Sequence, residues 1–270
     1  MRVRFWGVRG SVPWSTKQSV GYGGNTPCIE IRDEVSNELL ILDAGTGLVG
    51  LAESLGPQPE PTPILLTHYH WDHVQGLPFF PPFFRSGWAP AVWAPALGNV
   101  DRGAVDMLFE PPYFPIRFAH LESQASITLI EPGEMTIGGF QIRALPLTHP
   151  GGAFAYRIRG RGPTRDLVYA TDHEFGNTEV DAALAAFSIN AGATILDAHF
   201  TPEELPSYAG WGHATWRQCA EFASATGAGH LWLFHHRPGR TDSEVAAVEA
   251  SARRIYPATS AAREGDRFQL

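Results

Sequence analysis

Short runs in which apolar residues alternate with polar ones, or follow one another, dominate the beginning of the chain. Such runs are typical of half-buried and fully buried β-strands, and they predict strands over 3–8, 28–32, 39–42 and 64–67. Stretches rich in Gly and Pro at 21–25 and 56–63 predict turns between them. A helix is expected over 46–55. The first part of the chain is therefore predicted to form a sheet with a helix beside it.

The rest of the chain shows a similar pattern. It predicts strands over 127–130, 135–137, 140–146, 154–159, 167–170, 194–196 and 231–234, and helices over 97–109, 180–190, 215–226 and 243–255. Residues 77–95 are rich in Pro and aromatic side chains and are predicted to be irregular with one short helix. Thr215 and Gln218 fit a capping box, and Gly227 suits the end of that helix. Two similar halves predict two packed sheets flanked by helices, a single four-layer α/β domain over 1–270.

One segment after the predicted strand at 64–67 carries four potential metal ligands: His68, His70, Asp72 and His73. Positions i and i+2 of an extended chain face the same way, so His68 and His70 can bind one ion. Asp72 and His73 lie past the strand end and can turn toward a second ion. Neutral imidazole and carboxylate suit Zn²⁺ and neighbouring divalent ions. A His-rich surface loop is the alternative, which this spacing disfavours.

Three further predicted strands end close to a residue that can bind a metal. His149 follows the strand at 140–146, Asp172 follows 167–170 and His235 follows 231–234. A single histidine after a strand is more often a solvated or capping residue. Four strand ends with such residues favour a common site, because ligands gather where the ends of neighbouring strands meet.

Composition limits the class of protein. The 270 residues are 44% hydrophobic and 18% charged, as in an ordinary globular protein, and no apolar run reaches the roughly 18 residues of a transmembrane helix. The N-terminus lacks the apolar stretch of a signal peptide. Two cysteines give no disulfide framework, so a cytoplasmic protein with no membrane partner is expected. The net charge of −8 disfavours long RNA or DNA and leaves a small ligand open.

These residues together resemble the metallo-β-lactamase superfamily. The ligand segment, the three later ligands and Asp43 in the early Leu-Asp-Ala-Gly element carry the resemblance, which spans residues 1 to about 240. The Gly-His-Ala-Thr element around His213 is similar to the phosphodiesterase branch, which includes ribonuclease Z, cyclic-nucleotide phosphodiesterases and the cyclic-phosphate phosphodiesterase of phosphonate breakdown. The resemblance implies an α/β, four-layer αββα metallo-β-lactamase-like sandwich.

The resemblance also implies a dinuclear metal centre. One ion would be held by His68, His70 and His149. The other would be held by Asp72, His73 and His235, with Asp172 bridging both ions. His236 is the neighbouring alternative to His235, which the family motif favours. Two divalent ions are thus expected, Zn²⁺ by the affinity order and Mn²⁺ as the alternative.

Catalytic roles follow from the same resemblance. His213 would be the general acid or electrostatic stabiliser, and Asp72 is placed with it among the catalytic residues. Asp43 would hold the ligand loop by hydrogen bonds, and either Asp197 or His199 would orient His213.

The predicted reaction is hydrolysis of a small phosphodiester, such as a cyclic nucleotide or cyclic phosphate. Two divalent ions lower the pKa of a bridging water, which then serves as the nucleophile. The positive charge of two divalent ions exceeds the negative charge of two aspartates and one hydroxide by roughly one unit. This remaining positive charge suits a singly charged diester. Expected substrate contacts are Asn25, Tyr113, Phe114 and Trp211, although aromatic residues in Pro-rich segments more often serve packing or dimer contacts.

Other functions remain open. An ester or lactone hydrolase of this fold needs the seven ligands but not the element around His213. Ribonuclease Z-like RNA 3′ processing is weaker, because the chain is acidic and has no obvious long Gly/Pro-rich arm. A non-catalytic nucleotide-binding scaffold is disfavoured because every ligand position is filled. Relatives are often dimers, so a homodimer is a prior expectation that these residues do not test.

Overall fold

Strands and helices fill most of the computed structural model, which describes residues 1–98, 100 and 102–270. The strands are β1 (Arg2–Gly7), β2 (Cys28–Arg32), β3 (Leu39–Leu42), β4 (Thr62–Leu65), β5 (Pro90–Pro95), β6 (Ser126–Ile130), β7 (Gly133–Ile137), β8 (Phe140–Leu147), β9 (Ala153–Arg159), β10 (Leu167–Ala170), β11 (Ala193–Asp197), β12 (Leu231–Phe234), β13 (Thr259–Ala261) and β14 (Arg267–Gln269). The α-helices are α1 (Gly47–Ser54), α2 (Trp71–Val74), α3 (Gly103–Asp106), α4 (Thr178–Ser188), α5 (Trp216–Thr226) and α6 (Asp242–Arg253). Short 3₁₀ helices are η1 (Leu77–Phe79), η2 (Pro81–Phe84), η3 (Met107–Phe109), η4 (Phe118–His120) and η5 (Leu205–Ser207). Among the described residues, none of these helices combines the length and apolarity that a membrane crossing requires.

The described strands form two sheets of the same design. The first has the order β14-β1-β2-β3-β4-β5-β6 and the second the order β13-β12-β11-β10-β9-β8-β7. In each sheet three neighbouring pairs are antiparallel and three are parallel. The repeated order explains why the sequence reads as two similar halves.

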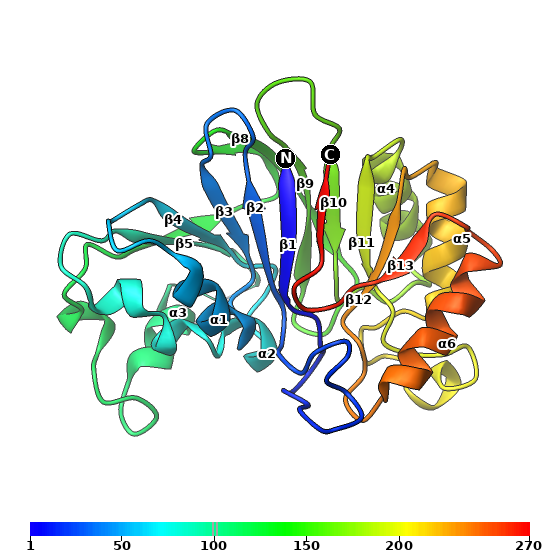
Figure 1. The fold of residues 1–270 in the computed structure, drawn as a ribbon, viewed down its shortest axis with the longest axis horizontal. Helices are drawn as coiled ribbons and strands as arrows, with labels where there is room; N and C mark the ends of the chain where they lie inside the picture. The colour runs from blue at the N-terminus through cyan, green and yellow to red at the C-terminus, as the bar shows by residue number, and fades with distance from the viewer. Residues whose placement is uncertain (99, 101) are drawn as a thin grey trace.

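Three apolar clusters define four layers. Phe5 of β1 and Phe234 of β12 belong to the cluster between the two sheets. A second cluster packs α4, α5 and α6 on the outer side of the second sheet, through residues such as Leu184 and Cys219. A third packs α1 and the segments 74–83 and 105–109 on the first sheet. Figure 1 shows the sheets facing each other with helices outside, which confirms the predicted αββα sandwich.

Most predicted elements are confirmed, and the exceptions have physical reasons. Residues 90–95 form the buried strand β5 rather than an irregular segment, because Pro90 and Pro95 stand at its two ends, where proline is tolerated. The predicted helix over 97–109 is limited to α3 and η3, with residues 99 and 101 outside the described part. The capping box at Thr215 and the left-handed Gly227 are confirmed. The three-residue strands β13 and β14 are too short to show a pattern.

Candidate metal centre

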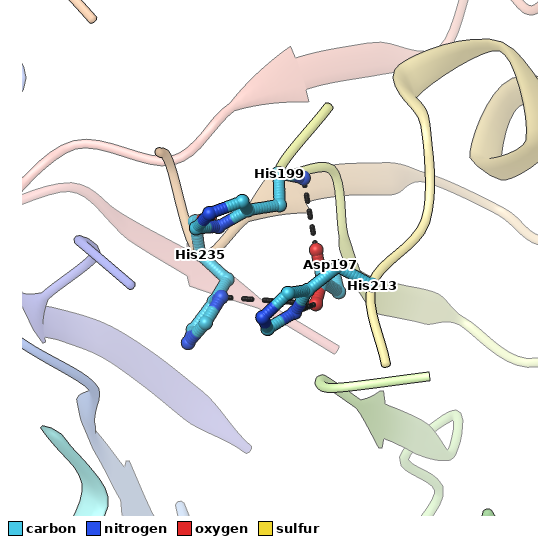
Figure 2. A group of neighbouring side chains, drawn as sticks. All are labelled: Asp197, His199, His213 and His235. Carbon is cyan, nitrogen blue, oxygen red and sulfur yellow. Dashed lines mark hydrogen bonds and ion pairs between the residues drawn. The ribbon is translucent and has the colours of Figure 1, made fainter. Parts of the chain in front are cut away.

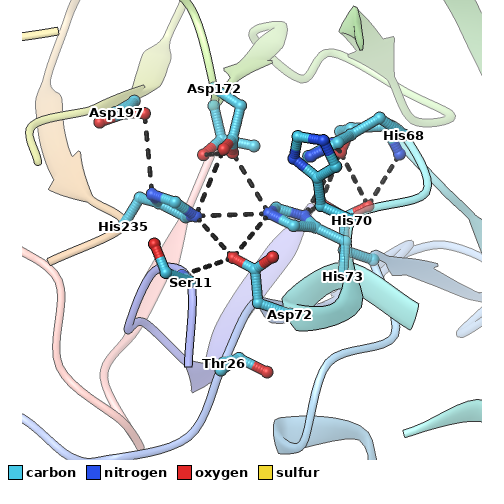
Figure 3. Close-up of polar contacts among 12 residues, drawn as sticks. Ser11, Thr26, His68, His70, Asp72, His73, Asp172, Asp197 and His235 are labelled. Atoms are coloured by element: carbon cyan, nitrogen blue, oxygen red, sulfur yellow. Dashed lines mark hydrogen bonds and ion pairs between the residues drawn. The ribbon is translucent and has the colours of Figure 1, made fainter. Parts of the chain in front are cut away.

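The predicted ligands meet at one edge of the sandwich. His68 and His70 follow β4, and the single helical turn α2 begins directly after His70 and carries Asp72 and His73. His149, Asp172 and His235 follow β8, β10 and β12. Figure 3 shows side chains from both sheets pointing toward one another at this edge. The sandwich therefore brings together residues that are more than 160 positions apart, such as Asp72 and His235.

Ligand atoms gather in the two predicted sets. One group consists of His68, His70 and His149, and another consists of Asp72, His73 and His235; in each group the ligand atoms lie within 4.8 Å of one another. Asp172 lies between the groups, because its two oxygens are 3.2 Å from His73 Nε2 and 3.9 Å from His149 Nε2. This is the arrangement that a carboxylate bridging two ions requires.

The spacing of these atoms fits a small cation. Nε2 of His73 and Nε2 of His235 lie 3.3 Å apart, and Asp72 Oδ2 lies 3.3 and 3.0 Å from them. A tetrahedral ion with bonds of 2.0–2.1 Å places its ligand atoms about 3.3 Å apart. In the described residues, Nε2 of His68 is buried and has no hydrogen-bond partner. A buried polar atom without a partner is costly, so this atom favours a ligand in the centre.

Three histidines of the centre donate hydrogen bonds away from it through Nδ1: His68, His73 and His149. His73 Nδ1 donates to Asp43 Oδ2 at 2.9 Å, and His149 Nδ1 donates to the Gly212 carbonyl at 3.0 Å. Thr67 Oγ1 donates to Asp43, so His68 Nδ1 donates to Thr67 Oγ1 at 3.0 Å. In each of these histidines Nδ1 carries the proton donated away from the centre, which leaves Nε2 as the nitrogen that can bind a metal once it is unprotonated.

Asp43 is the buried acceptor that orders the ligand loop. Its Oδ1 accepts from the Thr67 amide at 2.7 Å, and its Oδ2 accepts from His73 and from the Tyr169 hydroxyl, at 2.9 and 2.7 Å. The side chain is fully buried. Asp43 thus contacts the predicted ligand loop at Thr67 and His73, and its role toward a metal stays a prediction.

We expect Asp43→Asn to weaken metal binding by about 10–100-fold. The amide NH₂ would face N–H or O–H donors in either orientation, so at least one buried donor loses its acceptor. Metal affinity is measured by competition with a chelator. Asp33→Asn is the matched control, because Asp33 is also fully buried and accepts from backbone amides, but from those of residues 35, 36 and 161. Equal metal affinity in the Asp43 and Asp33 variants would contradict the assigned role.

The backbone is strained where the ligands meet. Among non-glycine residues, Ser11, Asp43, Asp172 and His235 have φ of 62°, 56°, 57° and 59°. Such left-handed residues are uncommon and cluster at functional sites. Ser11 was not predicted; its backbone amide donates to Asp72 Oδ2 at 2.6 Å. A backbone donor has no residue-type signal, so only the preceding Gly10 could have drawn attention to this loop.

Gly10 leaves room for the His235 ring. A Cβ on Gly10 would lie 2.4 Å from His235 Nδ1. We expect Gly10→Ala to displace the ring and to lower the occupancy of the site formed with Asp72 and His73. The clash also costs about 1–3 kcal/mol of stability. Metal content and thermal unfolding measure both effects, with Gly56→Ala as the control because nothing lies within 4 Å of its Cβ position. Full metal occupancy in Gly10→Ala would show that the ring can shift without loss of the ligand.

His213 lies beside the centre and is paired with Asp197. His213 Nδ1 donates to Asp197 Oδ2 at 2.6 Å and lies 3.6 Å from Asp172 Oδ1. Burial lowers the pKa of His213, but the negative charges of Asp197, Asp172 and Asp72 outweigh it and raise the pKa to about 9. The residue is 8% exposed, so His213 is largely buried beside the centre.

His199 contacts the other side of His213. The two rings stack with centroids 4.3 Å apart and planes 16° apart, and His199 Nδ1 donates to the His235 carbonyl at 3.0 Å. Figure 2 shows Asp197, His199, His213 and His235 as one group. Their ligand atoms lie within 4.8 Å of one another, but parallel rings direct their in-plane lone pairs side by side rather than at one ion. Asp197 is therefore the hydrogen-bond partner of His213, and His199 is a packing partner.

Two neighbouring histidines face elsewhere. His236 Nε2 donates to the Ala262 carbonyl at 2.8 Å, and burial lowers the pKa of His236 to about 3. His173 lies 3.1 Å from Asp181. Of the pair at 235–236, only His235 points into the centre.

The four expected substrate contacts differ in position. Asn25 donates its side-chain amide to Glu264 at 3.1 Å, and Phe114 packs against Phe79, Phe84 and Phe109. Tyr113 and Trp211 are 77% and 62% exposed. Trp211 directly precedes Gly212, whose carbonyl accepts from His149. Of the four, Trp211 is the one that adjoins the metal centre along the chain, and all four substrate roles stay predictions.

The protein has two facing sheets with helices outside them and a His/Asp cluster at their edge. These features define an αββα protein with a candidate metal-binding site. The family model described as "Beta-lactamase superfamily domain" matches residues 39–236. The chain therefore belongs to the metallo-β-lactamase superfamily, a hydrolase family. It is 24% identical to the Ribonuclease Z of Lacticaseibacillus casei (strain BL23) over 311 aligned residues, which cover 100% of this chain and 95% of the relative.

Solved structures agree on the fold. The metallo-beta-lactamase fold protein YhfI from Bacillus subtilis is 19% identical, with a TM-score of 0.73 over 100% of this chain and 98% of that one. Human tRNase Z, short form, is 18% identical, with a TM-score of 0.70 over 100% and 99%. A diphosphatase from the PhnP family is 15% identical, with a TM-score of 0.72 over 100% and 97%. These neighbours show that the fold is shared over the whole chain.

Proposed function

We propose that this protein is a dinuclear metal-dependent phosphodiesterase that hydrolyses a small diester, such as a cyclic nucleotide or cyclic phosphate. The observation that carries the proposal is the buried Asp197–His213 pair, 2.6 Å in length, beside Asp172 of the metal centre. A metal-activated water suits many substrates, whereas a positioned proton donor is needed when an alkoxide must leave. The Ribonuclease Z and PhnP-family likenesses support this class.

The ligand roles form part of the proposal. His68, His70 and His149 would hold one ion, and Asp72, His73 and His235 the other, with Asp172 shared between them. Two bound divalent ions, Zn²⁺ by affinity order or Mn²⁺ by availability, would lower the pKa of a water and neutralise charge on the substrate. Ser11 and Asp43 would hold Asp72 and His73 in place through hydrogen bonds of 2.6 and 2.9 Å.

His213 would move the proton. Because Nδ1 donates to Asp197, Nε2 is the atom left to give a proton to the leaving oxygen. The carboxylate of Asp197 stabilises the charged ring and fixes its orientation. The raised pKa of His213 keeps this proton on the ring near neutral pH, and cations beside Asp172 and Asp72 would reduce that rise. His213 is thus the proposed general acid, with Asp197 as its positioning residue.

A cavity beside the centre supports a small substrate. This open cavity of about 350 Å³ is lined by His149, Phe175, Asn177 and Gly212 with neighbouring residues. This volume lies within the range of small-molecule sites. Glu174, which also lines it, accepts from the amides of Gly210 and Gly212 at 2.7 Å and so fixes the loop that carries His213. The net charge of −8 further disfavours a long polyanion.

RNA 3′ processing is the second candidate function. The Ribonuclease Z likeness extends over the full chain, and this observation favours an RNA substrate. A turnover panel with Zn²⁺- or Mn²⁺-loaded protein separates the candidates: bis-p-nitrophenyl phosphate, 2′,3′- and 3′,5′-cyclic nucleotides, a short RNA with a 3′ extension, and a lactone. Preference for a cyclic diester supports the leading proposal. Preference for the RNA or the lactone replaces it, and binding of fewer than about two ions per chain defeats the dinuclear arrangement.

A further inference from the structure

A second concave site lies on the outer face of the first sheet, away from the metal centre. The groove encloses about 480 Å³ where β14, β1 and β2 run side by side. Val3 and Phe5 of β1 point into the core between the sheets, so Arg2 and Arg4 point outward, as alternation along a strand requires. Figure 1 shows both chain termini, which flank this groove, at the end of the sandwich opposite α2.

Positive charge dominates the lining of this groove. Arg2, Arg4, Arg32 and Arg267 line it together with Glu30. Arg32 is neutralised by Glu30 at 3.1 Å and by Glu60 at 2.7 Å. In the described part of the chain, no ion pair forms to Arg2, Arg4 or Arg267. Four guanidinium groups against two carboxylates therefore leave a net charge of about +2 at the groove.

Two of these arginines oppose each other directly. Arg4 and Arg267 are register partners in the antiparallel pair β1–β14, and like charges opposite each other destabilise a sheet. The Arg4 guanidinium is held over the Trp6 ring, 3.6 Å from its centroid, and its Nε is buried without a hydrogen-bond partner. Burial and then the charge of Arg267 lower the pKa of Arg4, against the smaller raising effect of Glu30. On the other side of Arg4, its register partner on β2 is Glu30, which offsets part of the positive charge and also pairs with Arg32. One carboxylate thus serves two arginines, so the charge of the Arg4–Arg267 pair is only partly compensated.

The second sheet shows that this is not a general property of the outer faces. A groove of about 650 Å³ there is lined by Arg143, Arg157 and Arg159. Asp166 accepts from Arg157 and Arg159 at 2.6 Å each, and Glu134 lies 3.7 Å from Arg143. Each of these three arginines thus has a carboxylate partner, whereas in the groove at β14–β1–β2 only Arg32 forms an ion pair among the described residues.

We propose that the groove at β14–β1–β2 binds a small anion with two or more negative charges, of the di- or triphosphate class. Planar guanidinium groups match phosphate oxygens with paired hydrogen bonds. The volume is that of a small-molecule site. The charge of the whole chain, −8, disfavours a nucleic acid as the occupant. The anion would replace the repulsion between Arg4 and Arg267 by a shared attraction.

The test is calorimetric titration of the metal-loaded protein with inorganic tripolyphosphate. R4Q/R267Q is compared with wild type and with R143Q/R159Q, which removes two positive charges from the other groove. Binding at the metal centre contributes equally to all three proteins, so differences between them report the groove. R4Q/R267Q should lose the groove component, weakened at least about tenfold, and R143Q/R159Q should retain it.

Thermal unfolding without ligand separates binding from a structural role. R4Q/R267Q should melt no lower than wild type, because the substitution removes a repulsion. R267Q alone changes an exposed position and is the milder variant. It should also melt no lower than wild type. The proposal is overturned if R4Q/R267Q binds tripolyphosphate like wild type, if the control loses affinity equally, or if both groove variants melt markedly lower. Tighter, Arg4-dependent binding of a 12-nucleotide single-stranded RNA would overturn the assignment to a small anion.

Discussion

Replacement of His213 by Ala is expected to lower the turnover of diesters with an alkoxide leaving group by about 10²–10⁴-fold. An alkoxide leaves readily only when it receives a proton, and Nε2 of His213 is the proposed source. p-Nitrophenolate leaves without a proton, so bis-p-nitrophenyl phosphate should be affected far less. The diagnostic result is therefore a change in the ratio of the two turnover numbers, in addition to a loss of activity.

Metal content and a second histidine variant serve as controls for this experiment. His213→Ala should retain about two ions per chain, because His213 is outside the proposed ligand sets. His120→Ala changes a histidine of η4 outside the centre and should keep both turnover numbers. An equal loss on both substrates, with metal retained, would show that His213 acts in binding or folding and not as an acid.

Asp197→Asn extends the same experiment to the positioning residue. The amide can present a donor to His213 Nδ1 and so select the wrong tautomer, an effect described for catalytic His–Asp pairs. Asp197 also accepts from the His199 amide at 2.8 Å, so metal content is measured beside activity to separate a role in catalysis from a role in structure. Loss confined to alkoxide leaving groups indicates a role through His213, whereas loss of metal indicates disturbance of the nearby His235.

The sequence predicts the fold well where strands are long or bounded by clear turns. β2, β3, β10 and β12 have the predicted limits, since each is a short apolar or alternating run with breakers on both sides. The sequence does not predict β5, because its prolines and Trp93 do not form the apolar or alternating run that is typical of a strand. In the structure β5 pairs with β4 on one side and β6 on the other. A tertiary partner on each side overrides the local signal.

The candidate site is readable from sequence because its ligands are of few types and follow strands. The sandwich then brings His68, Asp172 and His235 together without any local cue to their distance. The backbone groups that contribute to the site cannot be predicted from the sequence either. The Ser11 amide and the positive φ of Asp172 depend on the loop conformation and not on the residue type alone. The choice of Asp197 over His199 as partner of His213 likewise needed the geometry.

Asp172→Asn is expected to have the largest effect on the metal centre. Asn tolerates a left-handed backbone, so the φ of 57° is preserved and the substitution chiefly removes the charge. A bridging carboxylate holds both ions, so metal content should fall from about two ions per chain toward one or fewer. Metal-ion stabilisation is worth several kcal/mol, and each 1.36 kcal/mol is tenfold, so turnover should fall by about 10³-fold or more.

Asp166→Asn is the matched control for this change, because Asp166 and Asp172 flank the same strand, β10, at its two ends. Asp166 pairs with Arg157 and Arg159, so its replacement should lower the melting temperature and leave metal content and turnover per folded protein intact. Asp172→Asn should instead abolish most of the rise in melting temperature that added Zn²⁺ or Mn²⁺ produces, since that rise reflects binding to the folded state. Retention of two ions and full turnover in Asp172→Asn would exclude a bridging role. Loss of the charge of a carboxylate that is shared by both ions must change the metal content, the turnover or both.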